Sequence, residues 1–191
     1  GVDGDGDGHV LLKTSPEDAL LSGANLLRHH GWQAGRPWLT EVVMPEGFDW
    51  ALTGLATEKP VADWAALGVA ARHGALPEGS AASVILPQGR RGPAFLIYPN
   101  FRVLFEWNKS FTYVLTAGYF ATRIEGAPVF EPGNPRDGLN REQMQELQRL
   151  LTARGYDTGG TTGILGANTR IAVQDFQIQQ GLPADGWATP E

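Results

Sequence analysis

The sequence contains no cysteine, so disulfide bridges and thiolate metal sites are excluded. Long hydrophobic runs are also missing, and no stretch approaches the roughly 18 apolar residues that a membrane-spanning helix needs. Positive charge is scarce, because 15 Lys and Arg stand against 21 Asp and Glu, which gives a formal net charge of −6. Proteins that bind nucleic acids normally carry a basic surface, so we expect no nucleic acid partner.

The composition that remains is that of a folded protein, with 42% hydrophobic and 19% charged residues among 191. A chain of this length suits one ordinary domain and a second, smaller one. The chain begins at Gly1 and enters a motif directly. We therefore expect a processed or excised piece whose targeting signal lies upstream.

A helix is predicted from Pro16 to His30. Ser15 has the side chain of an N-cap, Pro16 suits the first helical position, and Gly31 can end the helix. The following residues, 32–100, are broken by Pro and Gly and predict a small, mainly β subdomain. Its apolar runs predict three strands, at residues 39–44, 82–86 and 94–98. Residues 61–67 predict a helical turn.

The remaining sequence divides into three parts. Residues 101–124 have helical periodicity and predict core helices. Residues 125–136 carry three prolines and no periodicity, which indicates a linker. Residues 137–191 contain two amphipathic stripes separated by a Gly-rich turn, and they predict a small helical unit.

The first residues match the start of a calcium-binding loop. Asp3, Asp5 and Asp7 stand at alternate positions before Gly8, as in the pattern D-x-[DN]-x-[DN]-G. His9 lies where such loops supply a backbone carbonyl. The twelfth position holds Thr rather than the bidentate Glu, so Glu17 or Asp18 would have to close a longer site. The alternative is a solvated Asp/Gly turn without a cation.

The terminal unit resembles the peptidoglycan-binding domain 1 family. The resemblance is carried by Leu147-Gln148-x-x-Leu151, Gly155-Tyr156, Gly163-Ile164-Leu165-Gly166, Thr169, Ala172, Phe176-Gln177 and Gly181-Leu182-Pro183-Ala184-Asp185-Gly186. It departs from that family at Thr162, where Asp is usual. Tyr156 and Asp157 are candidate ligand contacts, and the alternative is a packed Tyr and a turn Asp. Thr169 can cap the second helix or support the Gly-rich loop.

The first 124 residues resemble the membrane-bound lytic transglycosylase B family (glycoside hydrolase family 103). The matching strings are Asp3-Gly4-Asp5-Gly6-Asp7-Gly8-His9, Asp18-Ala19-Leu20, Ala24-Asn25, His30-Gly31-Trp32, Gly35-x-Pro37-Trp38, Glu41-Val42, Pro45-x-Gly47-Phe48-Asp49, Trp64-x-x-Leu67-Gly68-Val69, Gly92-Pro93-Ala94-Phe95-Leu96, Asn100-Phe101, and Asn108 with Tyr113. Because Asp18 lies in one of these strings, the resemblance favours it as the residue that closes the calcium loop.

This resemblance implies an enzyme that cleaves the MurNAc–GlcNAc bond of peptidoglycan to 1,6-anhydro products. In that family a single Glu acts as the acid and then as the base, and it lies upstream of the calcium loop. We therefore expect the catalytic Glu upstream of this chain and assign no catalytic residue within it. Glu41 and Glu106 are not substitutes on motif grounds, and we expect Glu41 to be an exposed strand residue.

The resemblance also places part of a substrate groove at Trp107, Asn108 and Tyr113. Trp107 stands where Tyr is usual, and an indole can still stack on a sugar face. Asn108 can both donate and accept hydrogen bonds to an N-acetyl group. The alternative is that Trp107 and Tyr113 are core aromatics and Asn108 caps a helix, while Phe101 is expected in the core.

Together these patterns predict an α+β protein in two parts. Residues 1–124 are expected to form the C-terminal part of a lysozyme-like core, with an EF-hand-like loop at 3–18 and the β subdomain. A linker at 125–136 leads to a small three-helix peptidoglycan-binding domain at 137–191. The expected cofactor is structural Ca²⁺, bound by Asp3, Asp5, Asp7, His9 and Asp18.

The expected partners are peptidoglycan strands and the N-terminal part of the same enzyme. The expected location is the periplasm or cell envelope of a Gram-negative bacterium, with outer-membrane association left open. One alternative function is a non-catalytic, calcium-stabilised fragment that binds peptidoglycan. A stand-alone calcium-binding structural protein is a further alternative, but it would leave the terminal module without a wall ligand to bind.

Overall fold

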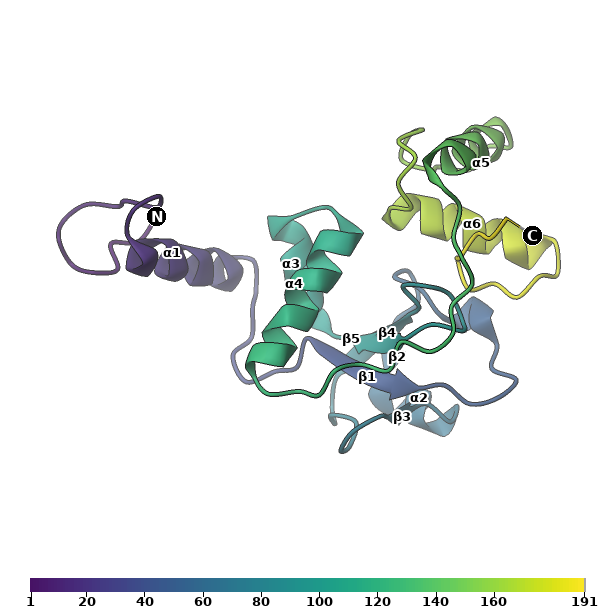
Figure 1. Cartoon of the computed structure of the whole chain (residues 1–191). Helices are drawn as coiled ribbons and strands as arrows, with labels where there is room; N and C mark the ends of the chain where they lie inside the picture. The colour runs from purple at the N-terminus through teal and green to yellow at the C-terminus, as the bar shows by residue number, and fades with distance from the viewer. Residues whose placement is uncertain (191) are drawn as a thin grey trace.

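The structure is a computed structural model that describes residues 1–190. A five-stranded antiparallel sheet lies at its centre, with α3 and α4 on one side (Figure 1). The strands are β1 (Leu39–Val43), β2 (Lys59–Pro60), β3 (Ala70–Ala71), β4 (Ala81–Ile85) and β5 (Ala94–Ile97), in the order β2-β4-β5-β1-β3. The three strands predicted from apolar runs are thus the three longest strands of the sheet.

Both faces of the sheet are buried, which explains why β5 is an unbroken apolar run and β4 has Ser83 as its one polar residue. Val84 and Leu96 face a core built around Trp64 of α2 (Val61–Ala66). Ile85 and Phe95 belong to the core on the other face, with side chains from α3 and α4. Successive residues of a strand point to opposite faces, so each strand contributes to both cores.

Two helices follow the sheet, in the region where residues 101–124 were predicted to form core helices. They are α3 (Pro99–Trp107) and α4 (Phe111–Ile124), joined by a short turn. Phe101 on α3 is fully buried, as predicted. The side chain of Ser110 caps α4 by accepting the N–H of Tyr113.

The first helix, α1 (Pro16–His29), extends away from the rest of the molecule (Figure 1). Its start is the predicted one, because the Ser15 hydroxyl oxygen accepts the N–H of Asp18. Gly31 follows its C-cap with a φ of 97°, a left-handed conformation that glycine adopts without strain. Leu20 and Leu26 on this helix are exposed.

The terminal unit holds two helices within the described residues, α5 (Arg141–Ala153) and α6 (Ala167–Gln179), whereas three were predicted. After α6 the chain turns at Gly181, where φ is 64°. Pro183 and Gly186 follow, and Gly186 has a positive φ of 66°. The stretch is instead held by Ala184 and Asp185, which are buried.

The terminal unit is docked on the sheet unit rather than suspended from it. The Arg170 guanidinium of α6 donates to the carbonyl oxygens of Leu86 and Pro87, at 3.4 and 2.7 Å. The Gln174 amide donates to the carbonyl of Thr53 at 2.8 Å. Asp185 forms an ion pair with Arg90 at 3.2 Å and also accepts its backbone N–H.

The segment between the two units, residues 125–140, forms neither helix nor strand, but it packs on the sheet unit. Phe130 contacts Phe95 and Tyr119 edge to face, with ring centroids 5.9 and 5.0 Å apart. The N–H of Asn134 donates to the carbonyl of Arg91. Within residues 1–190, no helix combines the length and the apolar character needed to cross a bilayer.

Candidate functional site

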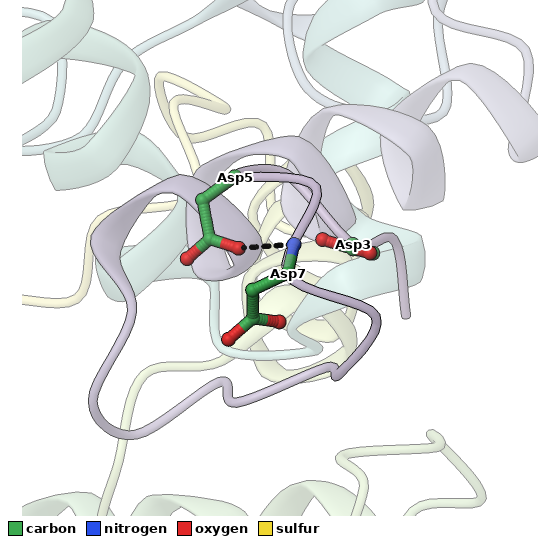
Figure 2. Close-up of side chains that lie close together, drawn as sticks. All are labelled: Asp3, Asp5 and Asp7. Carbon is green, nitrogen blue, oxygen red and sulfur yellow. Dashed lines mark hydrogen bonds between the residues drawn. The ribbon is translucent and has the colours of Figure 1, made fainter.

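The acidic loop brings three carboxylates together. One carboxylate oxygen from each of Asp3, Asp5 and Asp7 lies within 4.8 Å of the others (Figure 2). Gly6 and Gly8 have φ values of 77° and 87°, so the tight turn that joins the three acids depends on glycine. The alternating spacing therefore produces the predicted convergence.

Backbone N–H groups hold each carboxylate of this cluster. Asp3 accepts the N–H groups of Gly6 and Gly8, and Asp5 accepts that of Asp7. The Ser15 hydroxyl donates to the second oxygen of Asp5 at 3.1 Å, which ties the loop to the start of α1. A cluster whose ligand atoms are all carboxylate oxygens suits a hard cation such as Ca²⁺, which prefers oxygen ligands.

The two other predicted ligands lie outside this cluster. His9 is exposed, and its backbone N–H donates to Asp7 at 2.8 Å. Asp18 is buried, and its two oxygens accept the N–H groups of Gly4 and Leu11 at 2.7 and 2.6 Å. These hydrogen bonds, that from Leu11 foremost, lower the pKa of Asp18. In this geometry Asp18 closes the loop by binding backbone rather than by facing the other three carboxylates.

The predicted groove residues lie on the surface at the α3–α4 turn. Trp107 and Tyr113 are 48% and 47% exposed, and their rings meet edge to face at 5.3 Å. These two side chains are therefore not core aromatics. The Asn108 side-chain oxygen accepts the N–H of Ser110 and shapes the turn, and Asn108 is also the C-cap of α3. Its amide group donates to no group within residues 1–190.

The prediction that Glu41 is exposed was wrong. Its side chain is only 11% exposed, and Oε1 accepts from the Arg72 side chain at 2.7 Å and from the Glu131 N–H at 2.9 Å. Glu41 lies on β1, between β5 and the edge strand β3, where Arg72 and the Glu131 backbone cover it. Glu106 is more exposed and pairs with Lys109 at 3.0 Å.

The two candidate contacts in the terminal unit have structural partners. Tyr156 packs edge to face on Phe176. Asp157 accepts the N–H of Gly159 and the amide of Asn168, which makes it a turn residue. A ligand role for either residue remains a prediction, and their contacts match the packed-Tyr and turn-Asp alternative.

The sequence analysis named Thr169 as a possible support of the Gly-rich loop, but it gave Gln148 no role beyond its place in the motif. Gln148 is fully buried and binds the Ile164 carbonyl, the Gly163 N–H and the Thr169 hydroxyl. Thr169 in turn donates to the Thr158 carbonyl, so it supports the loop, while Gly166 occupies the N-cap. A polar residue within an otherwise apolar helical stripe was the available signal for Gln148.

Arg170 is the second residue that the sequence did not single out. Its guanidinium lies 4.6 Å above the Phe111 ring, and burial lowers its pKa to about 10 while the charge of Asp185 opposes that shift. It therefore stays charged at neutral pH. Among the described residues its Nε atom is buried without a hydrogen-bond partner.

Two protein families account for both parts of the chain. Residues 1–122 match the family model described as the Transglycosylase SLT domain, and residues 140–191 match that of a peptidoglycan binding domain. Because the first match covers more than half of the sequence, the chain belongs to the Transglycosylase SLT domain family.

Solved structures with a similar fold are also transglycosylases. SltB3 from Pseudomonas aeruginosa, in complex with NAG-anhNAM-pentapeptide, is 46% identical with a TM-score of 0.84, over 99% of this chain and 52% of that one. Escherichia coli Slt35 in complex with calcium is 27% identical with a TM-score of 0.52, over 65% of this chain and 39% of that one. The predicted lysozyme-like α+β class is thereby confirmed.

A curated relative matches the terminal unit alone. The spore cortex-lytic enzyme of Bacillus cereus is 41% identical over 51 residues, which are 27% of this chain and 20% of that protein. The chain spans about half the length of SltB3 and about a fifth of the spore enzyme.

Proposed function

We propose that this chain is the C-terminal portion of a peptidoglycan lytic transglycosylase of glycoside hydrolase family 103. The observation that carries the proposal is the coincidence, in one chain, of a Transglycosylase SLT domain and a peptidoglycan binding domain. The 46% identity to SltB3 over nearly the whole chain supports it. We further propose the division into residues 1–124, a linker at 125–136 and a binding domain at 137–191.

The reaction needs one acid–base carboxyl group. A Glu donates its proton to the glycosidic oxygen as the bond from C1 of MurNAc to that oxygen breaks. The C6 hydroxyl oxygen of the same sugar then bonds to C1 and returns its proton to the carboxylate. No water is consumed, because the nucleophile is intramolecular, in contrast to the two-carboxylate hydrolases. The anhydro sugar bound to SltB3 is the product type that this chemistry yields.

The residues of this chain would contribute binding and support rather than the acid. We place the catalytic Glu upstream of the calcium loop, in the N-terminal part of the enzyme. Trp107 and Tyr113 would stack on sugar rings, because they are exposed and adjacent. Asn108 has an unused amide that could donate to an N-acetyl carbonyl.

Calcium is the proposed cofactor of the loop. The carboxylates of Asp3, Asp5 and Asp7, with the backbone carbonyl of His9, would hold the ion, and the calcium complex of Slt35 supports this. A bound Ca²⁺ would supply the positive charge that offsets the repulsion of three close carboxylates. Asp18 stays a proposed ligand. It lies outside the cluster of Asp3, Asp5 and Asp7, and it supports the loop by accepting the N–H groups of Gly4 and Leu11.

The terminal unit would bind the cell wall. The protein would be located in the periplasm or cell envelope of a Gram-negative bacterium, and association with the outer membrane is left open. Tyr156 and Asp157 remain the proposed contacts of that unit with peptidoglycan. Both lie beside the Gly-rich loop, although each also has a partner within the unit.

The test is digestion of peptidoglycan sacculi, followed by mass spectrometry of the soluble products. We expect no release by the chain alone, and release of 1,6-anhydro-muropeptides, lighter by one water than hydrolysis products, by the chain joined to its upstream half. Products that contain the added water would contradict a transglycosylase. Anhydro products from the chain alone would contradict an upstream Glu.

The second candidate function is a non-catalytic peptidoglycan-binding fragment. The engagement of Glu41 by Arg72 and by the Glu131 N–H favours it for the chain alone, because that carboxylate is not free to serve as an acid. Binding to sacculi without release of products, even with the upstream half present, would support this alternative over the enzyme.

A further inference from the structure

A cleft with both polar and apolar lining residues lies where the two units meet. Its volume is about 300 Å³, which is at the lower end of the range for small-molecule sites. One wall is the start of α4 and the turn before it, with Lys109, Ser110 and Thr112. The opposite wall is the Gly-rich loop and the start of α6, including Thr162 and Asn168.

The cleft offers hydrogen-bonding groups that the fold does not use. Within residues 1–190, the Thr112 hydroxyl has no partner. Thr162 accepts the N–H of Ile164, which leaves its hydroxyl proton to donate. Asn168 donates to Asp157 through its nitrogen, so its carbonyl oxygen stays available. Hydroxyl and amide groups in an open, solvated cleft match the hydroxyl and N-acetyl groups of amino sugars.

The charge of the lining is also distinctive. No Asp or Glu lines the cleft, although the chain holds 21 of them, and Lys109 is its one charged residue among those described. Lys109 is 73% exposed in its side chain, and among residues 1–190 it pairs only with the exposed Glu106. An ammonium group has three donors, so it can bind a ligand carboxylate as well.

The position of the cleft links it to the aromatic pair. Lys109 and Ser110 lie in the turn that separates Trp107 from Tyr113, so the pair and the cleft share this turn. Phe111 also lines the cleft, and the Arg170 guanidinium stacks on its ring. A contact that docks the two units therefore adjoins the cleft.

We propose that this cleft is a binding subsite for the peptidoglycan strand, continuous with the Trp107–Tyr113 surface and formed jointly by the two units. Its ligand is an N-acetylated amino sugar whose stem peptide bears a free carboxylate, which Lys109 binds. The inference rests on the proposed function, because it presumes that the chain binds peptidoglycan. It adds that neither unit alone holds the complete subsite.

The first experiment blocks the cleft. Because the chain has no cysteine, Thr112→Cys provides a unique attachment point for a bulky maleimide. Gln179→Cys, at the opposite end of α6 and exposed, is the matched control. The probe is a purified peptidoglycan tetrasaccharide with its stem peptides, and calorimetry measures Kd. We expect the label at position 112 to raise Kd about tenfold or more, and the label at position 179 to leave it unchanged.

A second variant tests the charge without adding bulk. Lys109→Gln should raise Kd for the muropeptide by about three- to tenfold but leave Kd for chitotetraose, which has no carboxylate, unchanged. Lys13→Gln, in the first loop, is the control. Equal weakening for both ligands would overturn the carboxylate assignment.

The outcomes separate the inference from the proposed function. If the unmodified chain binds the muropeptide and the label at position 112 does not change Kd, the subsite is wrong and the proposed function stands. If the unmodified chain binds neither ligand, both are overturned.

Discussion

At the scale of single residues, Asp18 has a structural role beside the predicted one. The resemblance placed it among the calcium ligands, yet its carboxylate binds the N–H groups of Gly4 and Leu11. A buried carboxylate with two backbone donors is favoured in its ionised form, so its folded pKa lies below the ordinary value of 3.8. Its contribution to stability is therefore complete above that value, and it is lost as the pH falls through the lowered pKa.

Asp18→Asn should lower the melting temperature by several degrees at neutral pH, because an amide nitrogen would face one of the two N–H donors. The difference from the unmodified chain should shrink as the pH falls below about 3.8. Thermal denaturation between pH 7 and pH 2, with EDTA present to remove any effect of calcium, measures it. A difference that stays constant across this range would contradict the charged role.

The aromatic pair makes a similar point about single residues. Trp107 and Tyr113 are large apolar side chains that a sequence analysis could place in a core, but both are about half exposed. Exposed aromatics that contact each other are common at sites that bind sugars or proteins, because they supply area with little loss of conformational entropy.

At the scale of elements, the loop before α1 is the one whose stability should depend on a ligand. Its three carboxylates lie within 4.8 Å of one another, so they repel one another unless a cation binds. The Ser15 hydroxyl connects Asp5 to the cap of α1, which couples the loop to that helix.

Calcium should therefore raise the melting temperature, by an amount that corresponds to about 2.7 kcal/mol when free Ca²⁺ is about 100 times Kd. EDTA should reverse the shift, and Asp5→Ala should abolish the response. Asp175→Ala, which removes the same charge from exposed α6, should leave it intact. Differential scanning calorimetry measures all four cases, and a calcium response that survives Asp5→Ala would remove this site from consideration.

At the scale of the whole molecule, polar side chains dock the terminal unit onto the sheet unit. Arg170 contacts the carbonyls of Leu86 and Pro87 and the Phe111 ring, and Gln174 and Asp185 add contacts on either side. Such a boundary should be rigid, since most of its donors are paired away from water; among the described residues Arg170 Nε is a buried donor without a partner. A strand bound by the terminal unit would then keep a fixed position relative to the aromatic pair.

Arg170→Met should weaken this docking, because it keeps the apolar stem but leaves two carbonyls without their donor. We expect a loss of about 1–3 kcal/mol and a larger radius of gyration in small-angle scattering. Arg149→Met, on the exposed face of α5, should change stability by less than about 0.5 kcal/mol. An unchanged radius of gyration for Arg170→Met would show that docking does not depend on this side chain.

The sequence alone determined features that depend on residues close together along the chain. The start of α1 at Ser15, the three longest strands and the convergence of three aspartates follow from caps, apolar runs and alternating spacing. The resemblance to two families, drawn from motif order, was confirmed at the level of the Transglycosylase SLT domain and the peptidoglycan binding domain. Among residues 137–190 the structure has two helices, where a three-helix domain was predicted.

Only the tertiary structure decided which polar groups are buried and what they meet. Glu41 is covered by Arg72 and by residues 125–140, which lie 31 and about 90 residues away along the chain. Arg170 finds its carbonyl partners more than 80 residues before it. Local patterns do not encode contacts between residues this far apart along the chain, because burial is set by how separate elements pack. For the same reason the cleft between the two units is a property of the folded chain alone.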